Sequence, residues 1–180
     1  MRRLILLRHA KTETDAPSGH DHDRRLDDRG RSDAAEIGRW IGRNPPFPDL
    51  VLVSTAVRAR QTWDLVWEAM QDRVPAPEVE IVDELYGAEP TQLLRVVRMA
   101  AASDPKQLML VGHNPGLHEL ALMLAGHGDK AARKALEENL PTSGLAVLHF
   151  DTNDRTDVAF RRGKLALFVS PKLLRQMSKD

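Results

Sequence analysis

Short apolar runs alternate with segments of helical periodicity along this chain of 180 residues. The runs predict buried strands at residues 4–7, 50–53, 108–111, 145–150 and 165–169, with a weaker candidate at 79–82. Such runs, short and without polar alternation, are typical of strands that are covered on both faces. Apolar side chains recur at helical spacing within residues 34–41, 59–70, 93–102 and 117–124, and Gly126 is expected to end the last of these helices.

Strands that alternate with helices predict an α/β sandwich. Residues 145–169 read as a hairpin that turns near Asp154, so we expect a mixed, mostly parallel sheet. No internal repeat or low-complexity tract divides the chain, which predicts one domain over residues 1–180. The polar loop from Ala10 to about Asp28 is long, and loops beyond roughly 12–15 residues are usually functional or disordered.

Three of the apolar runs end at basic or imidazole side chains. Arg8 and His9 directly follow the first run, Arg58 lies shortly after the second, and His113 comes just after the third. In open α/β sheets, ligands bind outside the carboxyl ends of the strands. If these three strands are parallel neighbours, their four side chains converge on one crevice.

Two of these strand ends also lead into predicted helices. Ser54 or Thr55 is expected to cap the helix that carries Arg58, and Asn114 to cap the next helix with Pro115 at its first position. Helix N-termini present free N–H groups and partial positive charge, which favours anions. Together with the guanidiniums and imidazoles, they predict a site for a phosphoryl group.

The chemistry of these residue types assigns a role to each. A neutral imidazole at His9 can attack phosphorus in line and form a phosphohistidine, provided that its other nitrogen is held, as by a backbone carbonyl. Arg8 and Arg58 can neutralise the equatorial oxygens with paired hydrogen bonds. His113 can donate to the same oxygens as charge develops. Lys11 is a candidate for steering the substrate, or a solvated loop lysine.

Three sequence blocks resemble one known family. Residues 7–12 (LRHAKT), 54–62 (STAVRARQT) and 112–116 (GHNPG) resemble the motifs of the histidine phosphatase (phosphoglycerate mutase-like) superfamily in order and spacing. The short chain and the Pro-Thr-Ser-Gly sequence at 141–144 resemble the SixA-like phosphohistidine phosphatases. The resemblance implies a three-layer α/β/α sandwich, His9 as nucleophile, a phosphate pocket of Arg8, Arg58 and His113, and no metal.

One feature of that family has no obvious counterpart in this chain. Many members protonate the leaving group with an acidic residue carried by a longer insertion, and the nearest positional candidate here is Glu84. An imidazole that leaves a phosphohistidine is already activated when protonated, so it needs less assistance than an alkoxide. The missing acid therefore favours phosphoramidates or other activated phosphoryl donors over sugar phosphates.

Composition excludes several other functions. Lys plus Arg equal Asp plus Glu at 26 each, so no global field attracts nucleic acid or an anionic membrane. The absence of cysteine excludes disulfides and thiolate catalysis and suits the cytoplasm. No signal peptide, membrane span or cofactor fingerprint is visible, so we expect no cofactor. The His and Asp residues at 20–23 permit a metal site, a solvated loop or a pocket mouth.

These observations support a hydrolase of phosphohistidine on a signalling or phosphotransfer protein, with the oligomeric state open. A small-molecule phosphatase or phosphoglycerate mutase could use the same pocket, although a mutase needs a lid that excludes water. A phosphohistidine-binding module with little turnover is the alternative outside enzymes. A metallohydrolase built on residues 20–23 is more remote.

Overall fold

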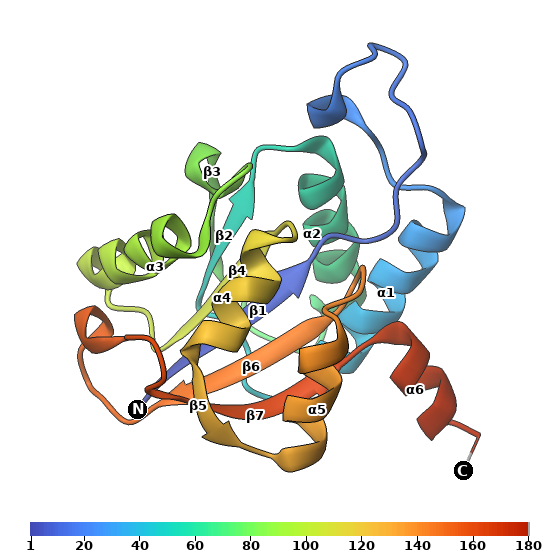
Figure 1. Ribbon diagram of the computed structural model, residues 1–180. Helices are drawn as coiled ribbons and strands as arrows, with labels where there is room; N and C mark the ends of the chain where they lie inside the picture. Colours follow the sequence, from blue (N-terminus) through green and yellow to red (C-terminus); the bar gives the residue numbers. More distant parts are fainter. Residues whose placement is uncertain (180) are drawn as a thin grey trace.

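The apolar runs of the sequence form the core of a seven-stranded sheet, in a computed structural model that describes residues 1–179 (Figure 1). The strands are β1 (Arg2–Arg8), β2 (Leu50–Ser54), β3 (Glu78–Val82), β4 (Gln107–Gly112), β5 (Ala125–Gly128), β6 (Leu145–Phe150) and β7 (Gly163–Val169). Their order is β3-β2-β4-β1-β6-β7-β5. β6 runs antiparallel to both of its neighbours and the other pairs are parallel, which confirms a mixed, mostly parallel sheet.

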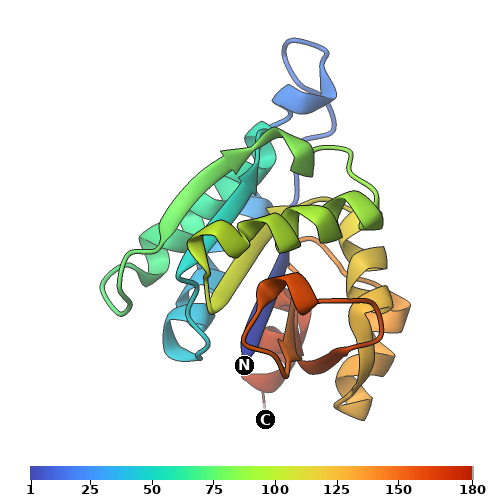
Figure 2. The same ribbon diagram turned by 90° about the vertical axis from the view of Figure 1, so that its left-hand side faces the viewer.

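Both faces of the central strands are covered, as the unbroken apolar runs require, whereas β3, the weaker candidate for a buried strand, is an exposed edge strand. In β1, Leu4 and Leu6 pack into one core while Ile5 and Leu7 pack into the other. One core lies under α3 (Pro90–Met99), α4 (Gly116–Leu124) and α5 (Lys130–Glu138), and the other under α1 (Asp28–Arg43), α2 (Val57–Met70) and α6 (Pro171–Met177) (Figure 2). This arrangement confirms the predicted three-layer α/β/α sandwich.

Some elements differ from those that the sequence predicts. The hairpin of β6 and β7 is present, but a single-turn helix at Arg155–Asp157 lies in its connection. Helix α3 begins at Pro90, before the predicted 93–102 range, because Glu89 and Gln92 form a capping box around the proline. Apolar periodicity did not reveal β5, α5 or α6, which are short and expose much of their surface.

The topology places the predicted site at one edge of the sheet. β2, β4 and β1 are parallel neighbours, so their carboxyl ends lie side by side. The loop from Ala10 to Asp27 extends from this edge in both ribbon views. A backbone bridge between Thr12 and Leu26 closes the loop at its base, and the Leu26 N–H donates to the Gln61 side chain at 2.9 Å. The long polar loop is therefore attached at its base to the edge of the sheet that carries the site.

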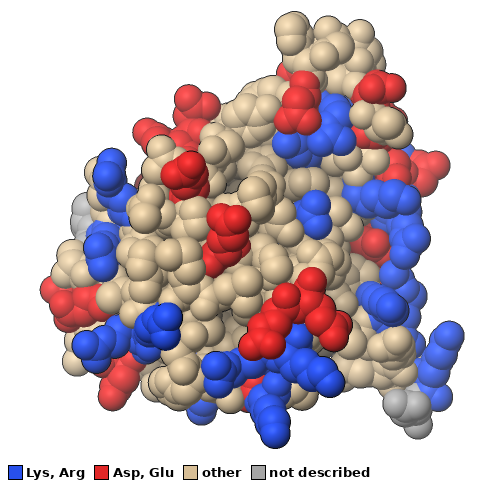
Figure 3. All heavy atoms as spheres, in the orientation of Figure 1, with Lys and Arg blue, Asp and Glu red and all other residues tan. Residues whose placement is uncertain are grey.

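Charge is spread over the surface without a dominant sign. Figure 3 shows acidic and basic side chains intermixed on the face that carries the site edge, in keeping with the balanced composition. Within residues 1–179, no helix has the length and apolar character needed to cross a bilayer.

Candidate active site

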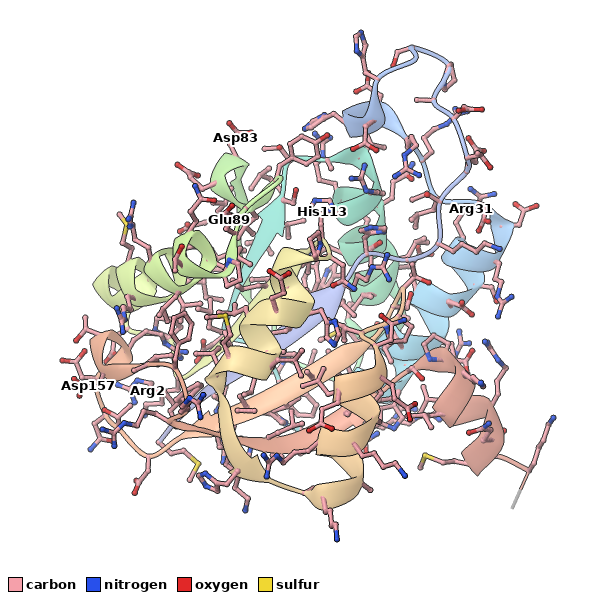
Figure 4. All side chains as sticks on the ribbon, viewed as in Figure 1. Arg2, Arg31, Asp83, Glu89, His113 and Asp157 are labelled. Carbon is pink, nitrogen blue, oxygen red and sulfur yellow. The ribbon has the colours of Figure 1, made fainter. Side chains whose placement is uncertain are left out.

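The four side chains that the sequence places at strand ends meet in one pocket. Arg8 ends β1, His9 follows it, and Arg58 lies in the first turn of α2. His113 connects β4 to α4 and is labelled in Figure 4. The ring centroids of His9 and His113 are 5.3 Å apart. Only 7% of His9 and 5% of Arg58 is exposed, so the pocket is largely shielded from water.

The orientation of the His9 ring follows from its hydrogen bonds. Its Nδ1 lies 2.7 Å from the backbone carbonyl oxygen of Ala10. A carbonyl oxygen can only accept, so Nδ1 carries the proton and the lone pair resides on Nε2. The backbone is fixed as well, since His9 N–H donates to the Gly112 carbonyl at 3.0 Å and the His9 carbonyl accepts from the Ser143 N–H at 3.1 Å. Nε2 is therefore the nitrogen available for attack.

The ring of His113 is hydrogen-bonded to a serine at the end of β2. His113 Nε2 lies 2.7 Å from Ser54 Oγ, and the same oxygen accepts the Ala56 N–H at 3.3 Å. The Ser54 hydroxyl accepts the backbone N–H with one lone pair and can donate its own hydrogen to Nε2. In that tautomer His113 carries its proton on Nδ1, where it can donate to an anion.

Polar atoms without partners gather around this pocket. Within the described chain, Arg8 Nε, Arg58 Nε, His113 Nδ1 and Ser143 Oγ are buried and make no hydrogen bond. Each unsatisfied buried donor costs about 1–3 kcal/mol. A tetrahedral oxyanion offers enough acceptor lone pairs to satisfy all of them at once.

Both guanidiniums are anchored by carbonyls on their outer sides. Arg58 Nη1 donates to the Asp21 carbonyl at 2.8 Å and Nη2 to the Asp21 carboxylate at 3.0 Å. Arg8 Nη1 donates at 3.2 Å to the Leu140 carbonyl, which also accepts from the Asn114 amide at 2.8 Å. A guanidinium held at its Nη end keeps its Nε–H edge free to bind an oxyanion.

Burial keeps both imidazoles neutral. It lowers the pKa of His9 to about 3, the Ala10 hydrogen bond opposes this shift, and the charges of His113, Arg58 and Arg8 add to it. Burial and then the Arg58 charge lower the pKa of His113 to about 4. At neutral pH, His9 therefore retains the lone pair that a nucleophile needs.

These lowered pKa values predict acid sensitivity of the fold. Below pH 6.5 the unfolded chain binds protons at both imidazoles, whereas the folded protein resists protonation until far lower pH. Acidification from about pH 7.5 to about pH 5 should therefore lower the unfolding free energy by about 2 kcal/mol for each histidine. Urea titrations at several pH values measure this slope. The His9→Ala/His113→Ala variant should show a flatter slope, and an unchanged one would contradict the assignment.

The two remaining candidates line neighbouring cavities. Glu84 is exposed on the single-turn helix at Asp83–Leu85 and lines a groove of about 610 Å³ between β3 and α3. Lys11 Nζ lies 3.9 Å from the Asp27 carboxylate and lines a different cavity, of about 340 Å³, beside α6. Among the described contacts, no hydrogen bond or ion pair joins either side chain to the four pocket residues.

The predicted helix caps are wrong. The residues at the cap positions of α2 and α4 are Ala56 and Pro115, and neither makes a side-chain capping bond. The Ser54 hydroxyl bonds His113 instead, and the Asn114 amide donates to the Leu140 carbonyl. Both side chains fix the pocket, because each reaches a partner across the site, and Ser54 Oγ accepts only the Ala56 N–H, which precedes the first turn of α2.

Tertiary contacts add Tyr86, which the sequence did not single out, and place Asp21 beside the pocket. Tyr86 donates its hydroxyl hydrogen to the Asp21 carboxylate at 2.8 Å, and its ring packs edge-on against His113 with centroids 5.5 Å apart. Asp21 belongs to the 20–23 run, for which a position at the pocket mouth was one interpretation. Within residues 1–179, no three His, Asp or Glu side chains are arranged to hold a metal ion.

Comparison with known proteins gives the family. Residues 4–89 match the model of the histidine phosphatase superfamily (branch 1). An uncharacterized protein of Mycobacterium tuberculosis is 38% identical over 145 residues, which cover 79% of this chain and 85% of that protein. A protein from Agrobacterium tumefaciens, described as a candidate phosphohistidine phosphatase SixA, has 34% sequence identity to this chain. Its crystal structure superimposes with a TM-score of 0.75, over 94% of this chain and 98% of the Agrobacterium chain.

A more distant structure shares the fold alone. The mycobacterial glucosyl-3-phosphoglycerate phosphatase is 18% identical, with a TM-score of 0.63 over 89% of this chain and 97% of its own. Proteins of this fold thus include a candidate phosphohistidine phosphatase and a phosphatase of a small molecule. From the family match, the extended identity and the fold, this chain belongs to the histidine phosphatase superfamily, among its SixA-like members, and is a phosphatase.

Proposed function

We propose that this phosphatase hydrolyses phosphohistidine on a signalling or phosphotransfer protein of the cytoplasm, by way of a covalent phosphohistidine on His9. The observation that supports this most is a neutral imidazole, oriented by the Ala10 carbonyl, in a pocket of unsatisfied donors. The description of the Agrobacterium relative as a phosphohistidine phosphatase favours the same substrate.

The first step transfers the phosphoryl group to the enzyme. The His9 Nε2 lone pair forms a bond to phosphorus while the bond from phosphorus to the substrate nitrogen breaks, and its electron pair stays with the leaving imidazole. Arg8 and Arg58 bind the equatorial oxygens through their Nε–H edges, and His113 donates from Nδ1. In this proposal, the two guanidiniums supply the positive charge that stabilises the transferred phosphoryl group.

The second step releases phosphate. A water oxygen attacks phosphorus, the bond to His9 Nε2 breaks, and the electron pair returns to that nitrogen. The Ala10 carbonyl holds Nδ1–H throughout, so the ring keeps its orientation between the two steps. A protonated imidazole leaves without an added acid, whereas a less activated substrate would draw a proton from a group such as Glu84, the candidate nearest in position.

A peptide phosphorylated on histidine tests the proposal directly. A histidine-containing peptide phosphorylated chemically on the ring should release inorganic phosphate, and rapid acid-free quenching should trap a phosphoryl group on His9 by mass spectrometry. A phosphoserine peptide of the same sequence is the matched control, and we expect it to react far more slowly because its alkoxide is a poorer leaving group. Turnover without any phosphoenzyme would contradict the proposed intermediate.

Other outcomes would point to the alternatives. Isomerisation of 3-phosphoglycerate would indicate a mutase, and preferred hydrolysis of small phosphomonoesters would indicate a metabolic phosphatase. Stoichiometric binding of the phosphohistidine peptide without phosphate release would indicate a binding module. Loss of turnover on adding a chelator would indicate a metal-dependent reaction.

A further inference from the structure

A single carboxylate lies at the rim of the cationic pocket. Asp21, in the single-turn helix at Asp21–Asp23, accepts from Arg58 in the pocket wall and from Tyr86 on the opposite rim. Its side chain is 54% exposed, in contrast to the buried Arg58 that it contacts. Because the contacts come from two separate elements, Asp21 is held in place and yet open to solvent.

The Asp21 carboxylate retains unused hydrogen-bonding capacity. Oδ2 accepts from Arg58 Nη2 at 3.0 Å and from the Tyr86 hydroxyl at 2.8 Å, while Oδ1 accepts from Arg24 Nε at 2.9 Å. A carboxylate offers about four acceptor positions. One position therefore remains on Oδ1, on a side chain that is half exposed and lies beside the buried donors of the pocket.

The charge of Asp21 already acts on an imidazole in this pocket. The pKa of His113 is lowered by burial and by Arg58, but the Asp21 charge shifts it in the opposite direction. Bonds from Tyr86, Arg58 and Arg24 keep Asp21 itself ionised, with its pKa lowered to about 2. The imidazolium of a substrate, placed at the mouth of the pocket, would be attracted by the same carboxylate. It would also lose less of its hydration than the buried His113 ring does.

We propose that Asp21 is a specificity-determining residue, which accepts a hydrogen bond from the distal ring N–H of the departing histidine. This inference rests on the proposed phosphohistidine substrate. When the bond between phosphorus and nitrogen breaks, a ring protonated on its distal nitrogen leaves as neutral imidazole. The Asp21 carboxylate stabilises that protonated form in the enzyme–substrate complex. The same charge repels leaving groups that carry a carboxylate, such as phosphoglycerate.

The test compares two leaving groups in one variant. In Asp21→Asn, we expect the ratio of kcat/KM for a phosphohistidine peptide to kcat/KM for p-nitrophenyl phosphate to fall about 10-fold, the effect of one charge-assisted hydrogen bond. The ratio cancels any loss that comes only from a shifted Arg58, because both substrates need that side chain. Asp23→Asn, in the same loop and bonded to the Ser18 hydroxyl, is the control and should leave the ratio unchanged.

The pH profile provides a second readout. Removing a negative charge lowers the pKa of a neighbouring imidazolium, so the alkaline limb of kcat for the peptide should move to lower pH in Asp21→Asn. The groups that face Asp21 are Arg58, Tyr86 and Arg24, with His113 and His22 nearby, and they are common to both substrates. The alkaline limb of the kcat profile for p-nitrophenyl phosphate should therefore stay at the same pH in Asp21→Asn.

Two results would overturn the inference, and they are distinguishable. If the wild-type protein cleaves the peptide but Asp21→Asn leaves the ratio and the alkaline limb unchanged, Asp21 only positions Arg58. If the wild-type protein hydrolyses p-nitrophenyl phosphate but not the phosphohistidine peptide, the proposed substrate fails, and the role of Asp21 with it.

Discussion

Replacing His9 with alanine should reduce turnover of p-nitrophenyl phosphate by at least about 10⁴-fold, the loss typical of removing a covalent nucleophile. The Nε2 lone pair is the atom that accepts the phosphoryl group, and no other imidazole in the pocket is oriented by a carbonyl in the same way. Steady-state kinetics measure the loss, and mass spectrometry should show that the phosphoenzyme is absent.

The fold should survive this substitution. The His9 ring contributes one hydrogen bond, and its neighbours in β1 keep their packing in both cores. Circular dichroism and the urea midpoint at neutral pH verify this. His127→Ala, at an exposed position in β5, is the matched control and should retain full activity. Substantial activity in His9→Ala would show that another group attacks phosphorus.

Replacing Arg58 with lysine should reduce kcat/KM by about 10²-fold or more, although the charge is retained. A guanidinium is planar and bonds the Asp21 carbonyl and carboxylate at its Nη end while its Nε–H edge remains free. The ammonium group of lysine cannot bond Asp21 and an oxyanion at the same time in that planar arrangement. The loss should be similar for p-nitrophenyl phosphate and a phosphohistidine peptide, because both present the same equatorial oxygens.

Arg60→Lys provides the control for this substitution. Arg60 lies two residues further along α2 and is exposed, so its replacement should leave kcat/KM unchanged. Inorganic tungstate binding gives a readout independent of turnover, and Arg58→Lys should weaken it while Arg60→Lys should not. Equal tungstate affinity in the two variants would exclude Arg58 from the oxyanion pocket.

Much of the fold could be predicted from local sequence patterns. Buried strands appear as unbroken apolar runs because both faces of each strand are covered, and the runs at 4–7, 50–53 and 108–111 are all central strands. The short elements β5, α5 and α6 were missed because they bury few side chains. Hydrophobic periodicity reports burial, so it is weakest where an element is mostly exposed.

The strand ends likewise determined which residues form the pocket. Arg8, His9, Arg58 and His113 each follow an apolar run, and parallel neighbouring strands must bring their carboxyl ends together. The sequence thus determined which chemical groups are present and at which edge of the sheet they gather.

Only the tertiary structure decided how those groups are oriented. The Ser54 hydroxyl reaches His113 across 59 residues of sequence, and Asp21 reaches Arg58 across 37. Such contacts follow from the path of loops and the rotamers of individual side chains, which leave no periodic pattern in the chain. The order of residues therefore determines which side chains form the pocket, because it determines which strands are buried. Directional hydrogen bonds between distant segments determine how those imidazoles and guanidiniums are oriented.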